Sequence, residues 1–318
     1  MKITHIHIER FRGFQNEDFE VGSLLTAIAG QNGTQKSTLL GIITQTFTLK
    51  TEDSMRVEKP LCGGSYISAF KDKFRLSPTF DKPKGHDAGM DDFTVESIKR
   101  TGDPNVRFWK KGARQEGDGY ISFPTIFLSL KRLVPVAEEA KIITDDTLLT
   151  QEELNEFKQL HNKILIAQTP ISSATTITSK NKQSIGVSTE LYDWNQNSMG
   201  QDNLGKIILA LFSFKRLHDK YPRQYKGGIL AIDEMDATMY PASQVELLKV
   251  LRKYASKLNL QILFTTHSMS LLKAMDDLVQ EVTKKEETAN QAKILYLKKV
   301  DDKIAIKQGV NFKGIQLI

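Results

Sequence analysis

Residues 30–37, GQNGTQKS, have the residue types and spacing of a loop that binds phosphate. In the pattern G-x-x-x-x-G-K-[ST], backbone N–H groups face the phosphates, the lysine reaches the β- and γ-phosphates, and the hydroxyl ligates Mg²⁺. Gly30, Lys36 and Ser37 match, whereas Gln35 stands where the second glycine belongs. A non-glycine residue with positive φ costs about 1 kcal/mol or somewhat more, which is small against the binding energy of a triphosphate. The sequence therefore predicts a nucleotide site, with a polar turn that caps a helix as the alternative; its residues are Asn32, Gly33, Thr34, Gln35, Lys36, Ser37 and Thr38.

Two apolar segments farther along the chain end in groups that could act on a phosphate. Residues 227–233, GGILAID, lead into Asp233 and Glu234. In phosphoryl-transfer sites an aspartate at a strand end orients Mg²⁺ through a water, and the adjacent glutamate polarises the attacking water. Residues 260–268, LQILFTTHS, place His267 at a second strand end, where parallel sheets bind their ligands. The alternatives are an acidic helix cap and an ordinary core or surface histidine.

A third group of small polar residues, NSMGQDN at 197–203, opens a predicted helix. Ser198, Gly200 and the unbonded amides there predict a second anion site, because the N–H groups at a helix N-terminus have no partner within the helix.

These groups are positioned by elements of two kinds. The chain predicts apolar strands that enter the loops, and helices that leave them. Thr150 and Glu153 have the spacing of a capping box, and Asp301-Asp302 marks a hairpin turn. The predicted strands are 2–8, 24–29, 125–130, 227–233 and 260–268; the helices are 37–47, 150–166, 202–219 and a stretch around 245–255; residues 168–190, rich in Ser and Thr, are predicted as loop.

Composition limits the classes of protein and of site that the chain could form. The 318 residues are 40% hydrophobic and 26% charged, which is typical of a globular protein with one large or two ordinary domains. The net charge of +6 permits anionic partners. The single cysteine, Cys62, excludes an internal disulfide and a thiolate zinc cluster, and fits a reducing cytoplasm. The charged N-terminus does not predict a signal peptide, and no apolar run reaches the ~20 residues of a membrane span.

Taken together and in this order, the motifs resemble the heads of ABC-type ATPases. NGTQKST is similar to their phosphate loop, SMGQ to their signature motif, ILAIDE to their magnesium and base strand, and TTHS to their switch histidine. DEMDATMYP and the opening IERFRGF resemble the chromosome-maintenance, RecF and OLD-like branch. The resemblance covers nearly the whole chain.

The resemblance implies an α/β fold, a P-loop ABC-ATPase head with a mostly parallel sheet, an antiparallel β lobe and a short helical insertion. We expect one head over 1–318, with the β lobe at 51–124, the insertion at 137–196 and the signature-bearing lobe at 197–318. ATP and Mg²⁺ are the implied ligands, Ser37 and Asp233 the metal-site residues, and Asp233, Glu234 and His267 the catalytic residues. Two basic residues of IERFRGF approach the nucleotide: Arg10 and Arg12.

The resemblance also implies an assembly. In this class the signature helix of one subunit completes the site of another, so Ser198, Gly200 and Gln201 would bind the γ-phosphate held by a second copy. ATP would then close a head-to-tail dimer or a higher homo-oligomer, and hydrolysis would release it. The insertion holds no sustained heptads, so a long coiled-coil arm is not expected.

The short form, with glutamine before the loop lysine, resembles ATPases of prokaryotic anti-phage systems such as Septu. Clustered nuclease carboxylates do not follow His267, so we expect a separate effector, a nuclease, or a domain beyond residue 318. A RecF-like DNA-repair ATPase and a nucleotide-locked scaffold with little hydrolysis are the alternatives. DNA or RNA could contact the basic run Arg107–Arg114 around Trp109, with a solvated face as the alternative. His5 and His7 do not predict a metal site.

Overall fold

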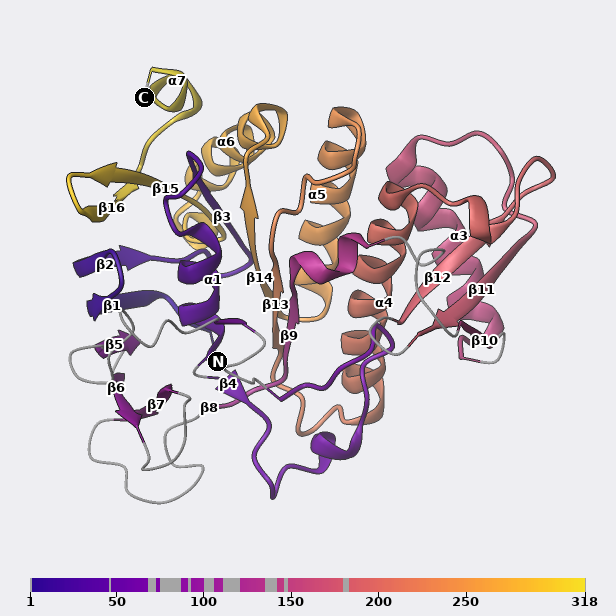
Figure 1. The fold of residues 1–318 in the computed structure, drawn as a ribbon, viewed down its shortest axis with the longest axis horizontal. Helices are drawn as coiled ribbons and strands as arrows, with labels where there is room; N and C mark the ends of the chain where they lie inside the picture. Colours follow the sequence, from indigo (N-terminus) through magenta and orange to yellow (C-terminus); the bar gives the residue numbers. More distant parts are fainter. Residues whose placement is uncertain are drawn as a thin grey trace.

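The computed structural model describes residues 2–45, 47–67, 73–74, 87–90, 93–99, 106–110, 121–134, 142–145, 148–179 and 183–317. Its centre is a six-stranded sheet in the order β16-β15-β3-β14-β13-β9 (Figure 1). All neighbours pair in parallel except β15 and β16, which form the predicted hairpin. The predicted mostly parallel sheet is therefore confirmed; its strands are β3 (Leu25–Gly30), β9 (Thr125–Leu128), β13 (Gly228–Ile232), β14 (Leu260–Thr266), β15 (Ala292–Val300) and β16 (Lys303–Gln308).

The two faces of this sheet pack against different layers, because successive side chains of a strand point to opposite faces. On β13, Leu230 and Ile232 lie in the larger core with α4, α5 and α6, whereas Ile229 and Ala231 lie in a second core with α1. Burial on both faces explains why the central strands read as uninterrupted apolar runs. The helices are α1 (Lys36–Gln45), α3 (Gln151–Leu165), α4 (Met199–Lys220), α5 (Pro241–Lys257), α6 (Met269–Thr283) and α7 (Phe312–Gln316).

A second, antiparallel sheet has the order β2-β1-β5-β6-β7. Three of its strands lie in the predicted 51–124 stretch, and two come from the N-terminus. The sequence analysis predicted β1 but missed β2, in which Asn16 has a φ of 54° and breaks the alternation that signals a strand. The strands are β1 (His5–Phe11), β2 (Phe14–Glu20), β5 (Asp87–Met90), β6 (Phe93–Lys99) and β7 (Val106–Lys110); a short parallel pair, β4 (Phe47–Thr48) and β8 (Ile121–Ser122), lies apart from it.

The insertion is more than a helix and a loop. The helix α3 begins as predicted, with a capping box in which Thr150 and Glu153 bond each other's backbone N–H. The prediction of a loop over 168–190 is wrong, because β11 and β12 pair there with β10 in an antiparallel sheet. Their Ser and Thr content suggested a loop, yet Thr is β-branched and favours strands, and β12 packs against α4. The strands are β10 (Ile143–Asp145), β11 (Ser173–Thr178) and β12 (Gln183–Ser188).

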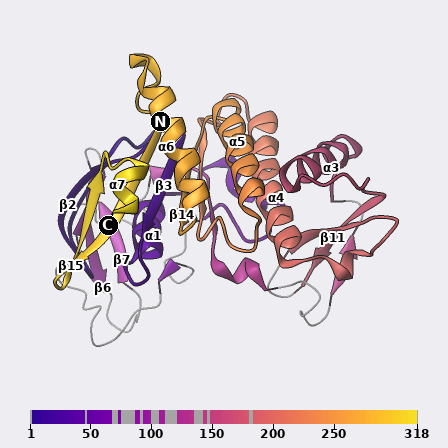
Figure 2. The same cartoon turned by 90° about the horizontal axis from the view of Figure 1, so that it is seen from above.

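The insertion and the antiparallel sheet lie at opposite ends of the molecule. Figure 2 shows β2, β6 and β7 at one end and α3 with β11 at the other, with α4 and α5 between them. Four single-turn 3-10 helices complete the described chain: η1 (Ser54–Val57), η2 (Leu130–Leu133), η4 (Trp194–Gln196) and η5 (Glu286–Thr288). Across the residues that the structure describes, no helix combines the length and apolar character needed to cross a membrane.

Candidate nucleotide site

The phosphate loop joins β3 to α1, as the motif requires. Only glycine fits at position 30, because its φ is 148° and an added Cβ would lie 2.4 Å from the Leu297 carbonyl oxygen of β15. Gly33 and Gln35 both have positive φ, 80° and 61°, and α1 begins at Lys36. The position of the missing glycine therefore does need a left-handed residue, and Gln35 carries that strain of about 1 kcal/mol.

The Gln35 side chain is used inside the protein. Its Oε1 accepts a hydrogen bond of 3.2 Å from the backbone N–H of Gly13, in the turn between β1 and β2. The fit is close: a Cβ on Gly13 would lie 2.8 Å from Gln35 Nε2 and 2.7 Å from Ile304 Cγ1. The residue that departs from the phosphate-loop pattern thus ties the loop to the antiparallel sheet.

Of the two predicted basic residues, Arg12 contacts the helix that follows the loop. Arg12 Nη1 donates to Thr38 Oγ1 at 3.1 Å, in the first turn of α1. Its guanidinium also lies 5.6 Å from the centre of the Phe11 ring and 5.7 Å from that of Phe74. Arg10 is exposed on β1, and its side chain hydrogen-bonds none of the residues that the structure describes.

Lys36 and Ser37 face the end of the central sheet. Lys36 Nζ donates to the carbonyl oxygens of Gly30 and Gln31 at 3.0 and 2.9 Å. Burial lowers the pKa of the Lys36 ammonium, and the carboxylates that follow β13 oppose that shift. Ser37 Oγ donates to Asp233 Oδ1 at 2.8 Å. A serine hydroxyl and a carboxylate that meet in this way are the hard oxygen donors that Mg²⁺ prefers, so the residues present fit that ion.

The acidic residues lie where β13 ends, beside the end of β14. Thr265 Oγ1 donates to Asp233 Oδ1 at 2.7 Å and accepts from the Glu234 backbone N–H at 2.6 Å, so one hydroxyl holds both acidic residues. Glu234 is half-buried, with a φ of 49°. His267 is exposed at the end of β14, and its backbone N–H donates to Asp236 Oδ1 at 3.3 Å. The predicted triad of Asp233, Glu234 and His267 is thus brought together near the phosphate loop.

The signature residues form the N-terminus of α4, and their polar groups bond one another. Ser198 caps the helix by accepting from the Gln201 N–H at 3.3 Å, and Gln201 Oε1 accepts from the Ser198 N–H at 2.8 Å. Gln201 Nε2 donates to Tyr192 Oη at 2.8 Å. The sequence analysis expected the backbone N–H groups at this helix end to be unbonded. Those of Ser198 and Gln201 instead have hydrogen-bond partners. Gly200 packs against the Thr238 carbonyl oxygen, which an added Cβ would approach to 2.5 Å.

The structure adds residues to the candidate site that sequence reasoning missed. Thr265 lies inside the TTHS motif and Asn203 inside NSMGQDN, so both motifs were recognised without their buried polar members. Arg132 lies in SLKRLVP after β9, where a lysine-arginine pair reads as solvent-exposed. It is instead 1% exposed and donates to the Glu234 carbonyl oxygen at 2.8 Å. A charged residue directly after an apolar strand was the available signal.

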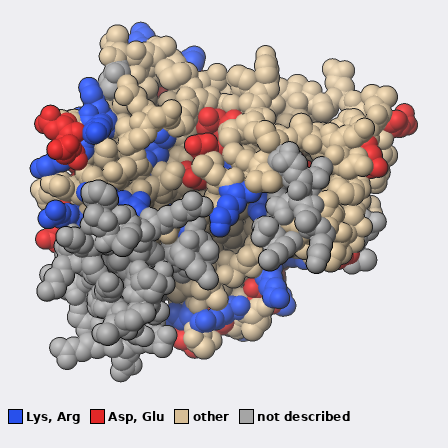
Figure 3. All heavy atoms as spheres, in the orientation of Figure 1, with Lys and Arg blue, Asp and Glu red and all other residues tan. Residues whose placement is uncertain are grey.

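Two further regions were considered in the sequence. The basic run Arg107–Arg114 with Trp109 lies outside the residues whose side chains the structure describes. On the face shown in Figure 3, the coloured Lys and Arg side chains are interspersed with Asp and Glu. His5 and His7 both contact Asp18, at 3.1 and 2.9 Å.

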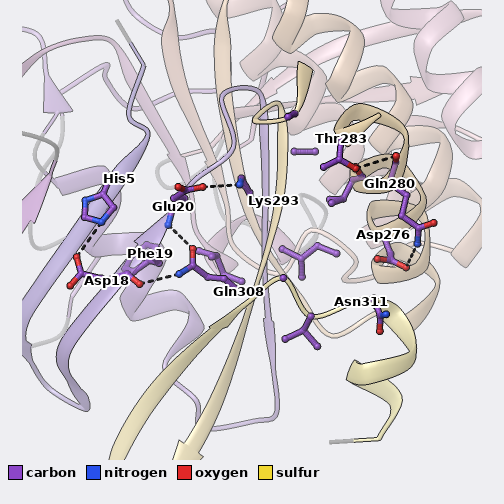
Figure 4. A pocket seen from close by; sticks show the side chains of 17 residues that line it. His5, Asp18, Phe19, Glu20, Asp276, Gln280, Thr283, Lys293, Gln308 and Asn311 are labelled. Atoms are coloured by element: carbon purple, nitrogen blue, oxygen red, sulfur yellow. Dashed lines mark hydrogen bonds and ion pairs between the residues drawn. The ribbon is translucent and has the colours of Figure 1, made fainter. Parts of the chain in front are cut away.

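Asp18 and His5 border a pocket between β2, β15 and α6 (Figure 4). Other polar side chains of that pocket also pair with each other, as Glu20 does with Lys293 at 2.8 Å.

Comparison with known proteins supports an ATPase. Residues 129–272 match the model of the AAA ATPase domain, a range that includes the signature, the acidic residues and His267 but not the phosphate loop. A search of the curated proteins found no match.

Solved structures show the same fold over nearly the whole chain. The SMC head domain from Thermotoga maritima is 14% identical, with a TM-score of 0.52 over 98% of this chain and 100% of that one. An SMC head bound to the C-terminal winged-helix domain of ScpA is 13% identical, with a TM-score of 0.54 over all of both chains. A Pyrococcus furiosus Smc head with an extended coiled coil, bound to the C-terminal domain of ScpA, is 12% identical, with a TM-score of 0.53 over 99% of this chain and 98% of that one. The chain therefore has an SMC-head-like P-loop ATPase fold.

Proposed function

We propose that this protein binds ATP with Mg²⁺ and hydrolyses it to ADP and phosphate. The observation that carries the proposal is the meeting of Ser37 and Asp233 at 2.8 Å, with Glu234 next in the chain. The phosphate loop supplies backbone N–H groups and a lysine, and the strand end supplies a metal-site carboxylate and a base. Bound Mg²⁺ would draw charge from the phosphate oxygens, with Ser37 and Asp233 as the residues that hold it.

The roles of the side chains follow from their positions. Lys36 would exchange its two carbonyl partners for the β- and γ-phosphates, because an ammonium group forms stronger hydrogen bonds with anions than with neutral carbonyls. Glu234 would accept a proton from the attacking water, held in place through its backbone by Thr265. His267, exposed at the neighbouring strand end, would contact the γ-phosphate.

Replacing the base tests this chemistry. In Glu234→Gln, ATP binding should persist while turnover falls by about 100-fold, since general-base catalysis contributes 10²–10⁴-fold. Glu287→Gln, an exposed residue of η5, is the matched control and should hydrolyse like wild type. ATPase assays combined with equilibrium binding of a fluorescent ATP analogue separate the two effects. Turnover by Glu234→Gln at the wild-type rate would refute the base assignment, and absence of ATP hydrolysis by wild type would refute the proposed activity.

We further propose that ATP closes two copies head to tail, with the signature residues of one copy on the γ-phosphate held by the other. Several large apolar side chains near the signature and after the strands of the central sheet are exposed, and this supports such a contact because exposed apolar side chains that gather mark protein–protein interaction sites. Tyr240 follows β13 and is 75% exposed, and Leu191 precedes the signature and is 80% exposed. Further exposed apolar side chains lie in or after η2 and at the first residues of α4 and α6: Leu130, Val134, Met199 and Met269.

We also propose that the ATP-bound state regulates a separate effector, a nuclease, in anti-phage defence. Its support is the motif resemblance, together with SMC heads of similar fold that were solved with a ScpA domain bound. The test is to express the chain together with its neighbouring gene in a bacterial host and to measure phage plating. Protection that is lost in Lys36→Ala would support the proposal. A pair that never protects, across a panel of phages, would overturn it.

A further inference from the structure

Arg132 is a buried cation that touches both halves of the proposed ATPase. It lies in η2, directly after β9, and is the largest side chain among those that are fully buried in the described part of the chain. Its Nε donates to Asn203 Oδ1 on α4 at 2.7 Å, and its Nη2 donates to the Glu234 carbonyl oxygen at 2.8 Å. Its Nη1 donates to the carbonyl oxygens of Leu128 and Ser129 at 3.3 and 3.1 Å.

Asn203 extends this contact to the far end of the same loop. It is 0% exposed, and its Nδ2 donates to the Ala237 carbonyl oxygen at 3.0 Å. Asn203 lies five residues after Ser198, on the helix that the signature motif opens. One guanidinium and one amide therefore connect α4 to the two ends of the segment from Glu234 to Ala237.

We propose that Arg132 and Asn203 are positioning residues that hold the Glu234 loop at a fixed place relative to the signature end of α4. The inference rests on the proposed ATPase function and concerns how its two halves are coupled. Both residues act through backbone carbonyls of this loop, Arg132 on that of Glu234 and Asn203 on that of Ala237.

The conformation of the loop explains why it needs such support. Glu234 has a φ of 49°, and Thr238, which directly follows the segment, has a φ of 67°, so non-glycine residues are left-handed at its start and just past its end. Residues with a side chain are strained in this conformation and persist in it only where the surroundings hold them. The carbonyl contacts of Arg132 and Asn203, with Gly200 packed against the Thr238 carbonyl oxygen, supply those surroundings.

The charge of Arg132 favours a positioning role over simple packing. Burial lowers its pKa to about 10, and the carboxylates of Asp233, Glu234 and Asp236 oppose that shift. A well-packed apolar side chain would fill the same volume without the cost of burying a cation. What an apolar side chain cannot do is donate to Asn203 and Glu234 at once, in the fixed geometry of the guanidinium fork.

The connection gives the two halves of the site one mechanical link. When the α4 N-terminus engages the phosphate of a second copy, any shift of the helix moves Asn203, and with it the carbonyls that place Glu234. The base is then set by the state of the signature helix, through contiguous hydrogen bonds.

Two variants and one control test the inference. Arg132→Lys keeps the charge but cannot donate to both partners, and Asn203→Asp keeps the acceptor for Arg132 but loses the donor to Ala237. Lys131→Ala, the exposed neighbour in η2, is the matched control. Hydrogen exchange of the amides from Met235 to Met239 should speed up by about tenfold in both variants, as expected for the loss of one hydrogen bond of this kind. Exchange in β13 should stay as in wild type.

Catalysis provides the second readout. In both variants kcat should fall by about tenfold while KM for ATP changes by less than about twofold, because the phosphate loop is untouched. Loop exchange equal to that of Lys131→Ala, or a raised KM at constant kcat, would overturn the inference. If Arg132→Lys does not fold, the results for Asn203→Asp alone decide whether the inference holds. A wild-type protein without ATPase activity would refute the proposed function, and the exchange experiment would still decide whether these residues position the loop.

Discussion

The phosphate loop with its neighbours, residues 30–38 and the β1–β2 turn, is built differently from the signature region, residues 198–203 and η2. In the first, side chains reach across the molecule, as Ser37 does to Asp233 and Gln35 to Gly13. In the second, Ser198 and Gln201 bond each other at the exposed helix end, while the buried Asn203 and Arg132 bond the segment that follows β13. The phosphate loop is thus already joined to Asp233, one of the proposed catalytic residues, whereas the signature presents an exposed helix end.

This difference fits a division of labour between two copies of the chain. A site that is assembled within one chain can bind nucleotide as a monomer. An exposed helix end with apolar side chains beside it suits a ligand that arrives with another molecule. Arg132 and Asn203 link the signature region to the loop that bears Glu234, through the carbonyl oxygens of Glu234 and Ala237. Variants of the phosphate loop should therefore lose nucleotide affinity, and variants of the signature region should lose ATP-driven association.

The largest expected effect is on nucleotide affinity and belongs to the phosphate loop. Lys36→Ala removes the ammonium group that would bind two phosphates, so the dissociation constant for ATP should rise by about 100-fold or more, since each charge-assisted hydrogen bond contributes about 1.5–3 kcal/mol. Isothermal titration with ATP and Mg²⁺ measures it. Lys50→Ala, which lies outside the loop, serves as the control. Unchanged affinity in Lys36→Ala would mean that this loop does not hold the phosphates.

A smaller effect, on association alone, is expected from the signature region. Ser198→Arg should leave ATP binding by the monomer close to wild type and weaken ATP-driven dimerisation roughly 10- to 100-fold, because a bulky side chain blocks the seat of the γ-phosphate. Ser198→Thr retains a helix-capping hydroxyl and is the control. Light scattering with and without ATP reports the assembly. A dimer that persists in Ser198→Arg would rule out the head-to-tail arrangement.

The sequence predicts the phosphate-loop side of the site better than the contacts of the signature region. The phosphate loop, the Asp233-Glu234 pair and the strands that deliver them are contiguous motifs with local signals. The contact from Arg132 to Asn203 and Glu234 joins segments 71 and 102 residues away, and no local pattern encodes it. Likewise β11 and β12 were missed because a Ser/Thr-rich stretch forms strands only where its segments pair with each other and one packs on a helix, as β12 does on α4. The strand β2 was missed because Asn16 interrupts its alternation.

Acid should destabilise the side of the molecule that bears α3. His161 of α3 is 2% exposed, its Nε2 has no hydrogen-bond partner, and burial lowers its pKa to about 4, with a small opposing contribution from Asn162. Its unfolded-state pKa is about 6.5, so above that pH neither state binds the proton. As the pH falls toward 4, only the unfolded chain takes it up, and stability falls. At pH 5 the loss should be about 2 kcal/mol, at about 1.4 kcal/mol per pH unit.

Urea unfolding at pH 7 and pH 5 measures this loss. His161→Phe should be less sensitive to acid by that amount, because Phe fills a similar volume and does not titrate. His218→Phe, a half-exposed residue of α4 beside Asp219, is the control for histidine removal. An equal pH dependence in wild type and His161→Phe would show that His161 does not titrate on unfolding.

The smallest expected effect tests the one departure of the phosphate loop from its pattern. Gln35→Gly relieves about 1 kcal/mol of left-handed strain but loses the hydrogen bond to Gly13, worth about 1 kcal/mol, and adds freedom to the unfolded chain. Its free energy of unfolding should therefore fall by less than about 1 kcal/mol. Gln35→Ala keeps the strain and loses the bond, so it should be the least stable of the three. If Gln35→Ala matched wild type in urea unfolding, the contact with Gly13 would contribute nothing. A free energy of unfolding that falls in the order wild type, Gln35→Gly, Gln35→Ala would instead show that glutamine is tolerated in a glycine position because its side chain fastens the loop to the β1–β2 turn.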